Sequence, residues 1–275
     1  MKQILTMILT LSLASQLQAA SIYNISSNSS WSSTIPSYCG NCTINIASGA
    51  TLNLNNSSMC DNCKISGGAI KITGGFSFQS STISNTSITA TSSFTLNNTN
   101  SFSDVTAVIS GSSSFTANGA LTLTNSSFTF KNTASFTSNG QLNIDNSQLD
   151  LNDNSHFTSN SSTVNLKNGS TLVAGDGSKS SKAYMIFYGQ LNLVDAASML
   201  IISNSNNYYY SWNTYKSQSN GTSYTTTSNY QAYYYGGAVF SSQGPLPISI
   251  LPITIDGFKA AEINPHSVKL TWTLT

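Results

Sequence analysis

The chain has 275 residues, of which 10 are Lys or Arg and 9 are Asp or Glu, so that only 7% are charged, against about 25% in typical soluble domains. A net charge of +1 provides too little positive field to gather nucleic-acid phosphates, which excludes nucleic-acid binding, and acidic metal sites are equally short of ligands. The 39% hydrophobic content excludes a disordered chain, and the abundant Ser, Thr and Asn favour strands and turns over helices.

The amino-terminal segment, residues 1–19, has the pattern of a secretory signal peptide. Lys2 gives a positive start, Ile4–Leu13 is an apolar run, and Ala19 is a small residue suited to cleavage. The apolar run is shorter than the about 20 residues that a membrane helix needs, and no later stretch qualifies. We therefore expect residues 1–19 to be removed and the mature protein to be secreted or to lie on the outer cell surface, with no membrane span.

A repeat with a period of about 21 residues runs through the middle of the chain. The hexapeptide that begins at Ser114 recurs at Ser135 and, less closely, at His156, and one step back from Phe115 reaches Phe94. Each repeat also contains pairs of apolar residues that alternate with polar ones, which is the pattern of a strand with one buried face. These apolar residues are Leu121, Leu123, Phe128 and Phe130 in one repeat and Leu142, Ile144, Leu149 and Leu151 in the next.

Three short strands in each repeat predict an all-β fold, a right-handed parallel β-helix whose coils lie about 4.8 Å apart. In such a fold Phe94, Phe115, Phe136 and Phe157 stack in one interior column. A less regular alternation on both sides extends the predicted β-helix over residues 20–205; the alternative is a β-sandwich with evenly spaced strands. We expect the asparagines at the turns to stack between coils or to satisfy backbone groups, namely Asn97, Asn118, Asn125, Asn139, Asn146 and Asn160.

All four cysteines lie in two Cys-x-x-Cys pairs, Cys39 with Cys42 and Cys60 with Cys63. Their spacing is that of a zinc ribbon in a cytosolic protein, but Cys39 and Cys60 are also separated by one period of the repeat, as are Cys42 and Cys63. Partners one coil apart fall within the Cα range of a disulfide, and an exported protein meets an oxidising environment. We expect disulfides from Cys39 to Cys60 and from Cys42 to Cys63; bonds within each pair are the second interpretation, zinc the third and catalytic thiol chemistry the last.

The predicted coils are followed by a tyrosine-rich segment, residues 206–243. We expect this segment to cap the exposed end of the last coil. The alternative is a glycan-binding surface, because sugar rings stack on aromatic faces and hydroxyl groups find amide partners. The residues expected at that surface are Tyr208, Tyr209, Tyr210, Trp212, Tyr233, Tyr234 and Tyr235.

Closely spaced prolines in residues 244–252 predict a linker, and residues 253–275 predict two strands that open a β-sandwich. The steps Leu251-Pro252, Phe258–Ala260 and Val268–Trp272 resemble the segment that opens a fibronectin-type-III-like module in secreted and surface proteins of Bacteroidota. The resemblance extends to the Cys-x-x-Cys coils and to Ser180–Tyr184, and it implies export by type IX secretion. The chain departs from the pattern because it ends after two of about seven strands, without a sorting domain, and we expect a fragment or a truncated product.

Candidate catalytic groups are few, although polysaccharide lyases and hydrolases on β-helices need carboxylates or basic groups on one outer face. Asp145, Asp150 and Asp153 are the nearest candidates, and we expect them to be scattered surface residues, since Lys167 belongs to the coil after Asp145. His156 is expected at the surface before Phe157.

We do not expect an ice-binding threonine array, because the alternation of Thr122 and Thr124 does not recur one coil later. The sequence thus predicts a non-enzymatic structural or adhesin-like protein without a cofactor, whose partner is an extracellular glycan, the matrix or a surface protein. The alternatives are a carbohydrate-binding module that uses the tyrosine-rich segment and a polysaccharide lyase or hydrolase.

Overall fold

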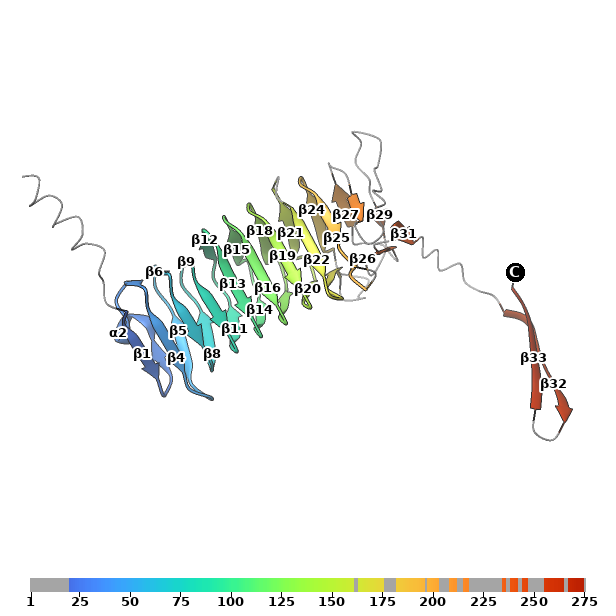
Figure 1. Cartoon of the computed structure of the whole chain (residues 1–275), viewed down its shortest axis with the longest axis horizontal. Helices are drawn as coiled ribbons and strands as arrows, with labels where there is room; N and C mark the ends of the chain where they lie inside the picture. Colours follow the sequence, from blue (N-terminus) through green and yellow to red (C-terminus); the bar gives the residue numbers. More distant parts are fainter. Residues whose placement is uncertain are drawn as a thin grey trace, which may run out of the picture.

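The computed structural model describes residues 20–160, 163–175, 182–195 and 197–202, and beyond these the backbone of the strands between 208 and 274. It shows an all-β parallel solenoid in which the chain passes through three sheets in turn and returns above its starting point (Figure 1). We call these sheets A, B and C in the order in which the chain first enters them. Strands of sheet A pair with strands of sheet A in the coils before and after, and the same holds for sheets B and C.

Sheet A consists of ten parallel strands: β1 (Ile22–Ile25), β4 (Thr43–Ile46), β7 (Lys64–Ser66), β10 (Thr82–Ser84), β13 (Asn100–Ser103), β16 (Leu121–Thr124), β19 (Leu142–Asp145), β22 (Val164–Lys167), β25 (Leu191–Leu193) and β28 (Tyr215–Ser217). Sheet B consists of eleven strands: β2 (Ser29–Ser30), β5 (Thr51–Leu54), β8 (Ala69–Ile72), β11 (Ser87–Ala90), β14 (Thr106–Ile109), β17 (Ser127–Phe130), β20 (Gln148–Leu151), β23 (Thr171–Ala174), β26 (Met199–Ile202), β30 (Ala238–Ser241) and β31 (Gly244–Leu246). Sheet C consists of ten strands: β3 (Tyr38–Gly40), β6 (Ser58–Asp61), β9 (Phe76–Gln79), β12 (Phe94–Asn97), β15 (Ser114–Ala117), β18 (Ser135–Ser138), β21 (His156–Ser159), β24 (Tyr184–Phe187), β27 (Tyr208–Ser211) and β29 (Tyr234–Tyr235).

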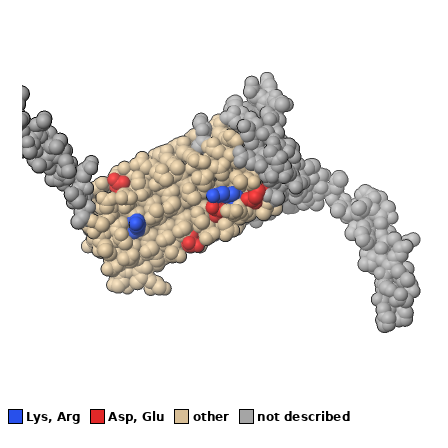
Figure 2. All heavy atoms as spheres, viewed as in Figure 1, with Lys and Arg blue, Asp and Glu red and all other residues tan. Residues whose placement is uncertain are grey.

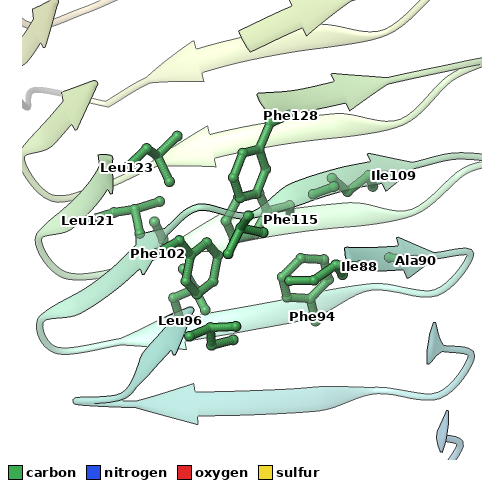
Figure 3. Close-up of a cluster of buried hydrophobic side chains, with 14 of the residues drawn as sticks. Ile88, Ala90, Phe94, Leu96, Phe102, Ile109, Phe115, Leu121, Leu123 and Phe128 are labelled. Carbon is green, nitrogen blue, oxygen red and sulfur yellow. The ribbon is translucent and has the colours of Figure 1, made fainter. Parts of the chain in front are cut away.

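The interior of the solenoid is filled by the alternate side chains of all three sheets. The predicted phenylalanine column is confirmed, because Phe94, Phe115, Phe136 and Phe157 are successive partners in sheet C. The rings of Phe94 and Phe115 lie 4.6 Å apart and nearly parallel, and so do those of Phe115 and Phe136. Rings from the other sheets pack beside this column (Figure 3). Offset stacking of aromatic rings adds to the free energy gained by burying them.

The coil length that the repeat predicts is not kept along the whole solenoid. Phe76 pairs with Phe94 across a coil that is shorter than the repeat, whereas His156 pairs with Tyr184 across a longer one. The coils near Phe76 are shorter because β7 and β10 each lack one residue, as do both corners that flank sheet C. Alternation inside each strand is unaffected by these changes, and the buried faces therefore stay aligned.

Asparagine and glycine form the corners of the coils. Asn125 and Asn146, at equivalent corners between sheets A and B, have positive φ values of 48° and 45°, a conformation that Asn tolerates better than most residues. At the corner after sheet C, a Cβ atom on Gly119 would overlap the carbonyl oxygen of Asn98 in the coil below. Only glycine permits this close approach of successive backbones.

The predicted asparagine stacking is also confirmed. The side-chain amide of Asn118 donates to that of Asn97 at 2.9 Å, Asn139 donates to Asn118 at 2.8 Å, and Asn160 donates to Asn139 at 2.9 Å. A second ladder joins Asn146 to Asn125 at 2.8 Å. The amides of Asn118 and Asn139 both donate and accept along the solenoid axis, so the corners add hydrogen bonds to those of the sheets.

The amino-terminal end of the core is covered by α2 (Trp31–Thr34). Trp31 is fully buried, its indole N–H donates to the carbonyl oxygen of Pro36 at 2.7 Å, and its ring meets Phe76 edge-on at 4.8 Å. No helix in the described part of the chain has the length and apolar character to cross a membrane.

At the other end, parallel pairing continues past residue 205 into β27 and β28. Antiparallel strands then cover the last edges of sheets B and C: β29 pairs with β27, β30 with β26, and β31 with β30. The predicted linker therefore begins with a paired strand, and Pro245 is tolerated there because β31 lies at a sheet edge. The two strands expected near the carboxyl end are present as an antiparallel hairpin of β32 (Ile255–Asn264) and β33 (Ser267–Leu274).

Replacement of Phe136 by Ala is expected to destabilise the solenoid by about 3–5 kcal/mol, because it leaves a cavity between the rings of Phe115 and Phe157. Thr137→Ala is the matched control, since the neighbouring side chain points outward from the same strand; it is expected to change the free energy of unfolding by about 0.5 kcal/mol or less. Urea unfolding followed by circular dichroism measures both. Equal effects of the two substitutions would contradict the interior column.

Candidate functional site

The outer face of sheet C carries three regular columns of uncharged polar side chains, which we call the hydroxyl face. Successive coils place Ser over Ser, Thr over Thr and Asn over Asn in register. Its members are Ser93, Ser114 and Ser135 in the first column, Thr95, Thr116, Thr137 and Thr158 in the second, and Asn97, Asn118, Asn139 and Asn160 in the third. A repeated threonine column therefore exists on this sheet, although Thr122 and Thr124 of sheet A do not form one.

A groove opens at the amino-terminal end of the hydroxyl face. Its volume is about 580 Å³. The groove is lined by Ser37, Ser57, Ser58, Met59, Gly75, Phe76, Ser77, Ser93 and Thr95. Met59, Ser77 and Thr95 are successive partners in sheet C, so they continue the threonine column into the groove. Gly75 precedes β9 and contributes no side chain, which leaves the groove open between Ser57 and Ser93.

An exposed aromatic side chain stands beside this groove. Tyr38 is the sheet partner of Met59 and is 49% exposed. Its hydroxyl group donates to Oδ2 of Asp61 at 3.2 Å. The negative charge of Asp61 is the main cause that raises the pKa of Tyr38, so the phenol stays protonated and keeps donating. The Asp61 carboxylate thus holds the tyrosine ring against the outer surface of sheet C.

The opposite end of the hydroxyl face holds an aromatic pair. His156 occupies the column position of Ser135, and its ring stacks on that of Tyr184 with centroids 4.8 Å apart and planes 8° apart. Partial burial lowers the pKa of His156 and raises that of Tyr184, which favours the neutral forms of both. The prediction that His156 lies near the surface is confirmed, because the residue is half-buried.

Most of the aromatic residues predicted to contact glycans belong to the last two strands of sheet C. Tyr208, Tyr209 and Tyr210 are part of β27, whose backbone pairs with β24, and Tyr234 and Tyr235 form β29. Trp212 and Tyr233 lie outside the described residues, as does the predicted signal peptide, residues 1–19. Tyr38, Met59 and Gly75 were not predicted; Cys39 and Cys60 mark Tyr38 and Met59 as neighbours, since each cysteine directly follows one of them.

The candidate carboxylates each have a local partner. Asp145 is the sheet partner of Lys167, and the two form an ion pair of 3.0 Å, so the expectation that Lys167 lies apart from Asp145 because it belongs to the next coil is wrong. Residues at equivalent positions of successive coils are sheet partners, so the side chains of Asp145 and Lys167 lie side by side. Partial burial alone would raise the pKa of Asp145, but hydrogen bonds from Asn168 and Lys167 outweigh it and the pKa is lowered.

The other two carboxylates belong to other surfaces of the solenoid. Asp150 is half-buried on sheet B; burial raises its pKa, and a hydrogen bond from Gln148 only partly opposes the increase. Asp153 accepts a hydrogen bond from the backbone N–H of Asn132 at 2.8 Å, at a corner after sheet B. Asp145 lies on sheet A, so the three carboxylates are divided between different faces and corners.

The structure overturns the preferred disulfide pairing. Cys39 and Cys60 are sheet partners, as the spacing predicted, but the bonds join Cys39 to Cys42 and Cys60 to Cys63. Equivalent side chains in a parallel sheet point in the same direction and stay about one strand spacing apart, further than the roughly 3.8 Å between Cβ atoms in a disulfide. A corner instead turns the two cysteines of one pair toward each other.

Asn41 and Asn62 form those two corners with φ values of 55° and 51°, and the bonded Cα atoms lie 6.0 and 5.9 Å apart. All four cysteines are buried, and none is a free thiolate for the zinc site that was the third interpretation. Among the residues that the structure describes, no group of three or more His, Cys, Asp or Glu is placed to hold a metal ion.

The fold and these surfaces define a parallel β-solenoid with a polar outer face. Comparison with protein-family models, curated proteins and solved structures finds no match to the chain. The function must therefore be inferred from the solenoid and its surfaces.

The disulfide pairing can be tested by cleaving the non-reduced protein with cyanogen bromide. Met59 lies between the two pairs, and cleavage after it separates Cys39 and Cys42 from Cys60 and Cys63. Cleavage also occurs after Met185 and Met199, so the two fragments that contain cysteine are the one that ends at Met59 and the one that spans residues 60–185. We expect these two fragments to be unlinked in mass spectrometry, and each to be lighter than its reduced form by the mass of two hydrogen atoms. Fragments that stay joined until a reductant is added would show bonds between coils instead.

Replacement of His156 by Ser, the residue of the two preceding coils, is expected to remove a loss of stability in mild acid. The folded-state pKa of His156 is lowered from 6.5, so the unfolded chain binds the proton more readily. Stability is therefore complete above about pH 6.5 and falls as the pH drops below it. Melting temperatures of both proteins between pH 7.5 and 5 measure this, and an unchanged difference across that range would contradict the shift.

Proposed function

We propose that the chain is a non-enzymatic structural or adhesin-like protein that presents the outer faces of a stiff β-solenoid to its surroundings. The observation that carries the proposal is the continuous parallel register of all three sheets, which runs from the first coil to β26 in sheet B, β27 in sheet C and β28 in sheet A. Every interior strand is hydrogen-bonded to the coils before and after it. In such arrays the free energy of unfolding is approximately a sum over the coils and the interfaces between neighbouring coils. A rod built in this way holds its surface groups at fixed spacings.

The surface chemistry supports a role in contact with an uncharged partner. Figure 2 shows only a few charged residues on a face that is otherwise formed by uncharged side chains. The hydroxyl face extends this character over at least four coils, from Thr95 to Thr158. Regular hydroxyl and amide groups without charge suit hydrogen bonding to a glycan or to another polar surface.

Export and attachment form the second part of the proposal. The signal-peptide pattern of residues 1–19 supports secretion or display on the outer cell surface, and the disulfides support an oxidising destination. The resemblance to Bacteroidota surface proteins supports type IX export and a hairpin of β32 and β33 that begins a fibronectin-type-III-like module. The usual handedness of parallel crossovers supports a right-handed solenoid. Glycan binding is the second candidate function, and the groove beside Tyr38 favours it.

The proposal is tested by deleting the gene and restoring it with variants. We expect the deletion to reduce attachment of cells to glycan- or matrix-coated surfaces. The double variant Asp145→Asn, Asp150→Asn is expected to restore attachment fully, whereas Phe115→Ala with Phe136→Ala, which breaks the rod, is not. Release of reducing ends or unsaturated products from polysaccharides by the purified protein, abolished in the Asp→Asn variant, would replace this function with an enzymatic one.

A further inference from the structure

We propose that the groove beside Tyr38 binds a neutral sugar unit of an extracellular polysaccharide, whose chain continues along the hydroxyl face. This inference rests on the proposed adhesive function and names the partner and the binding site. It places the glycan site at the amino-terminal end of sheet C, at the far end of the face from β27.

The lining of the groove has the mixed chemistry that a sugar ring requires. Sugar rings present C–H groups on their faces and hydroxyl groups around their rims. Met59 supplies an apolar surface beside the buried Phe76, and the remaining side chains of the lining are hydroxyl groups of Ser and Thr. Small-molecule sites commonly combine an apolar lining with a few convergent polar groups.

Tyr38 supplies a held aromatic surface at the rim. Its hydrogen bond to Asp61 restrains the ring before any ligand arrives, and a restrained ring loses less conformational entropy on binding. The carboxylate of Asp61 has further lone pairs that can accept from sugar hydroxyl groups. A tyrosine ring next to hydroxyl groups and one acceptor is a suitable platform for the face of a sugar.

Charge determines which polysaccharides fit. Among the residues of the groove, its rim and the hydroxyl face, only Asp61 is charged. A polyanionic chain would meet no cation there and would be repelled by that carboxylate. The face therefore selects neutral polysaccharides over uronate-containing or sulfated ones.

The repeat of the face matches a repeating ligand. Each coil presents the same Ser, Thr and Asn about 4.8 Å after the last, along the solenoid axis. An extended polysaccharide laid along that axis meets the same set of groups at every step, so weak contacts accumulate along one chain as they do in multivalent binding.

The aromatic pair at the other end does not offer an equivalent platform. The rings of His156 and Tyr184 stack face to face, and each therefore covers one face of the other. Tyr38 has no ring contact of this kind among the described residues, and half of its surface is exposed.

Binding of the full mature protein to neutral β-glucans tests the inference. Affinity electrophoresis in gels that contain hydroxyethyl cellulose or laminarin measures retardation, and polygalacturonate serves as the charged comparison. We expect retardation by at least one neutral glucan and none by polygalacturonate. Equal or stronger retardation by the charged polymer, or no retardation by either neutral glucan, would overturn the proposal.

Two variants localise the site. Tyr38→Ala removes the aromatic platform, and Gly75→Tyr fills the groove. A Cβ atom at Gly75 meets only Oγ of Ser57, at 3.6 Å, so the backbone accepts the change. We expect each to weaken binding at least tenfold. Thr129→Tyr is the matched control, because it adds the same side chain to the outer face of sheet B, and it is expected to bind like the unmodified protein.

Circular dichroism and melting temperature show whether each variant is folded. Folded Tyr38→Ala and Gly75→Tyr proteins that bind as strongly as the control would overturn the groove as the site. If the same variants still restore attachment of cells, that result contradicts the groove as the binding site but not the adhesive function. The adhesive function itself would be contradicted by a different measurement, the release of reducing ends or unsaturated products from polysaccharides by the purified protein. That measurement does not use the groove variants, so the two failures can be told apart.

Discussion

The parallel backbone ladder between successive coils is the constraint on which the rest of the molecule depends. It fixes each residue directly above its equivalent in the coil below, so a side chain meets copies of its own position rather than a varied environment. Phe115 therefore stacks between two phenylalanines, and Asn118 donates to one asparagine and accepts from another. With only 7% charged residues, these like-on-like contacts replace the ion pairs that stabilise many other surfaces.

The coil, the interior column and the asparagine ladders were predictable from the sequence. Equivalent residues recur about every 21 positions, and apolar residues alternate with polar ones within each strand, so both patterns can be read directly from the residues. The shorter coils near Phe76 were not predictable. Their strands keep the alternation, while corners one residue shorter shift the phase between strands. Backbone conformation sets corner length: Ser80, with its positive φ, begins the two-residue corner after β9, whereas the equivalent corner after β15 has one residue more and includes Gly119.

Distance along the chain misled the sequence-based interpretation in two opposite ways. Cys39 and Cys60 are spatial neighbours, yet the direction of their side chains prevents a bond and each bonds across its own corner. Asp145 and Lys167 were expected to be kept apart by their place in successive coils, yet that separation makes them sheet partners and an ion pair. Spacing alone gives proximity; the parallel side-chain directions within a sheet decide which pairs can form.

The candidate site was the least predictable part, because none of its residues has a local signature. Tyr38, Met59 and Gly75 come from three different parts of the sequence, and the dense tyrosines of residues 206–243 are a far stronger aromatic signal. Stacking brings the three together, and the missing side chain of Gly75 opens the groove. Such a groove needs no change in the core, since outward positions alternate with the buried ones that carry stability. A solenoid can therefore gain or lose a binding site on one coil while its backbone ladder and interior columns stay the same.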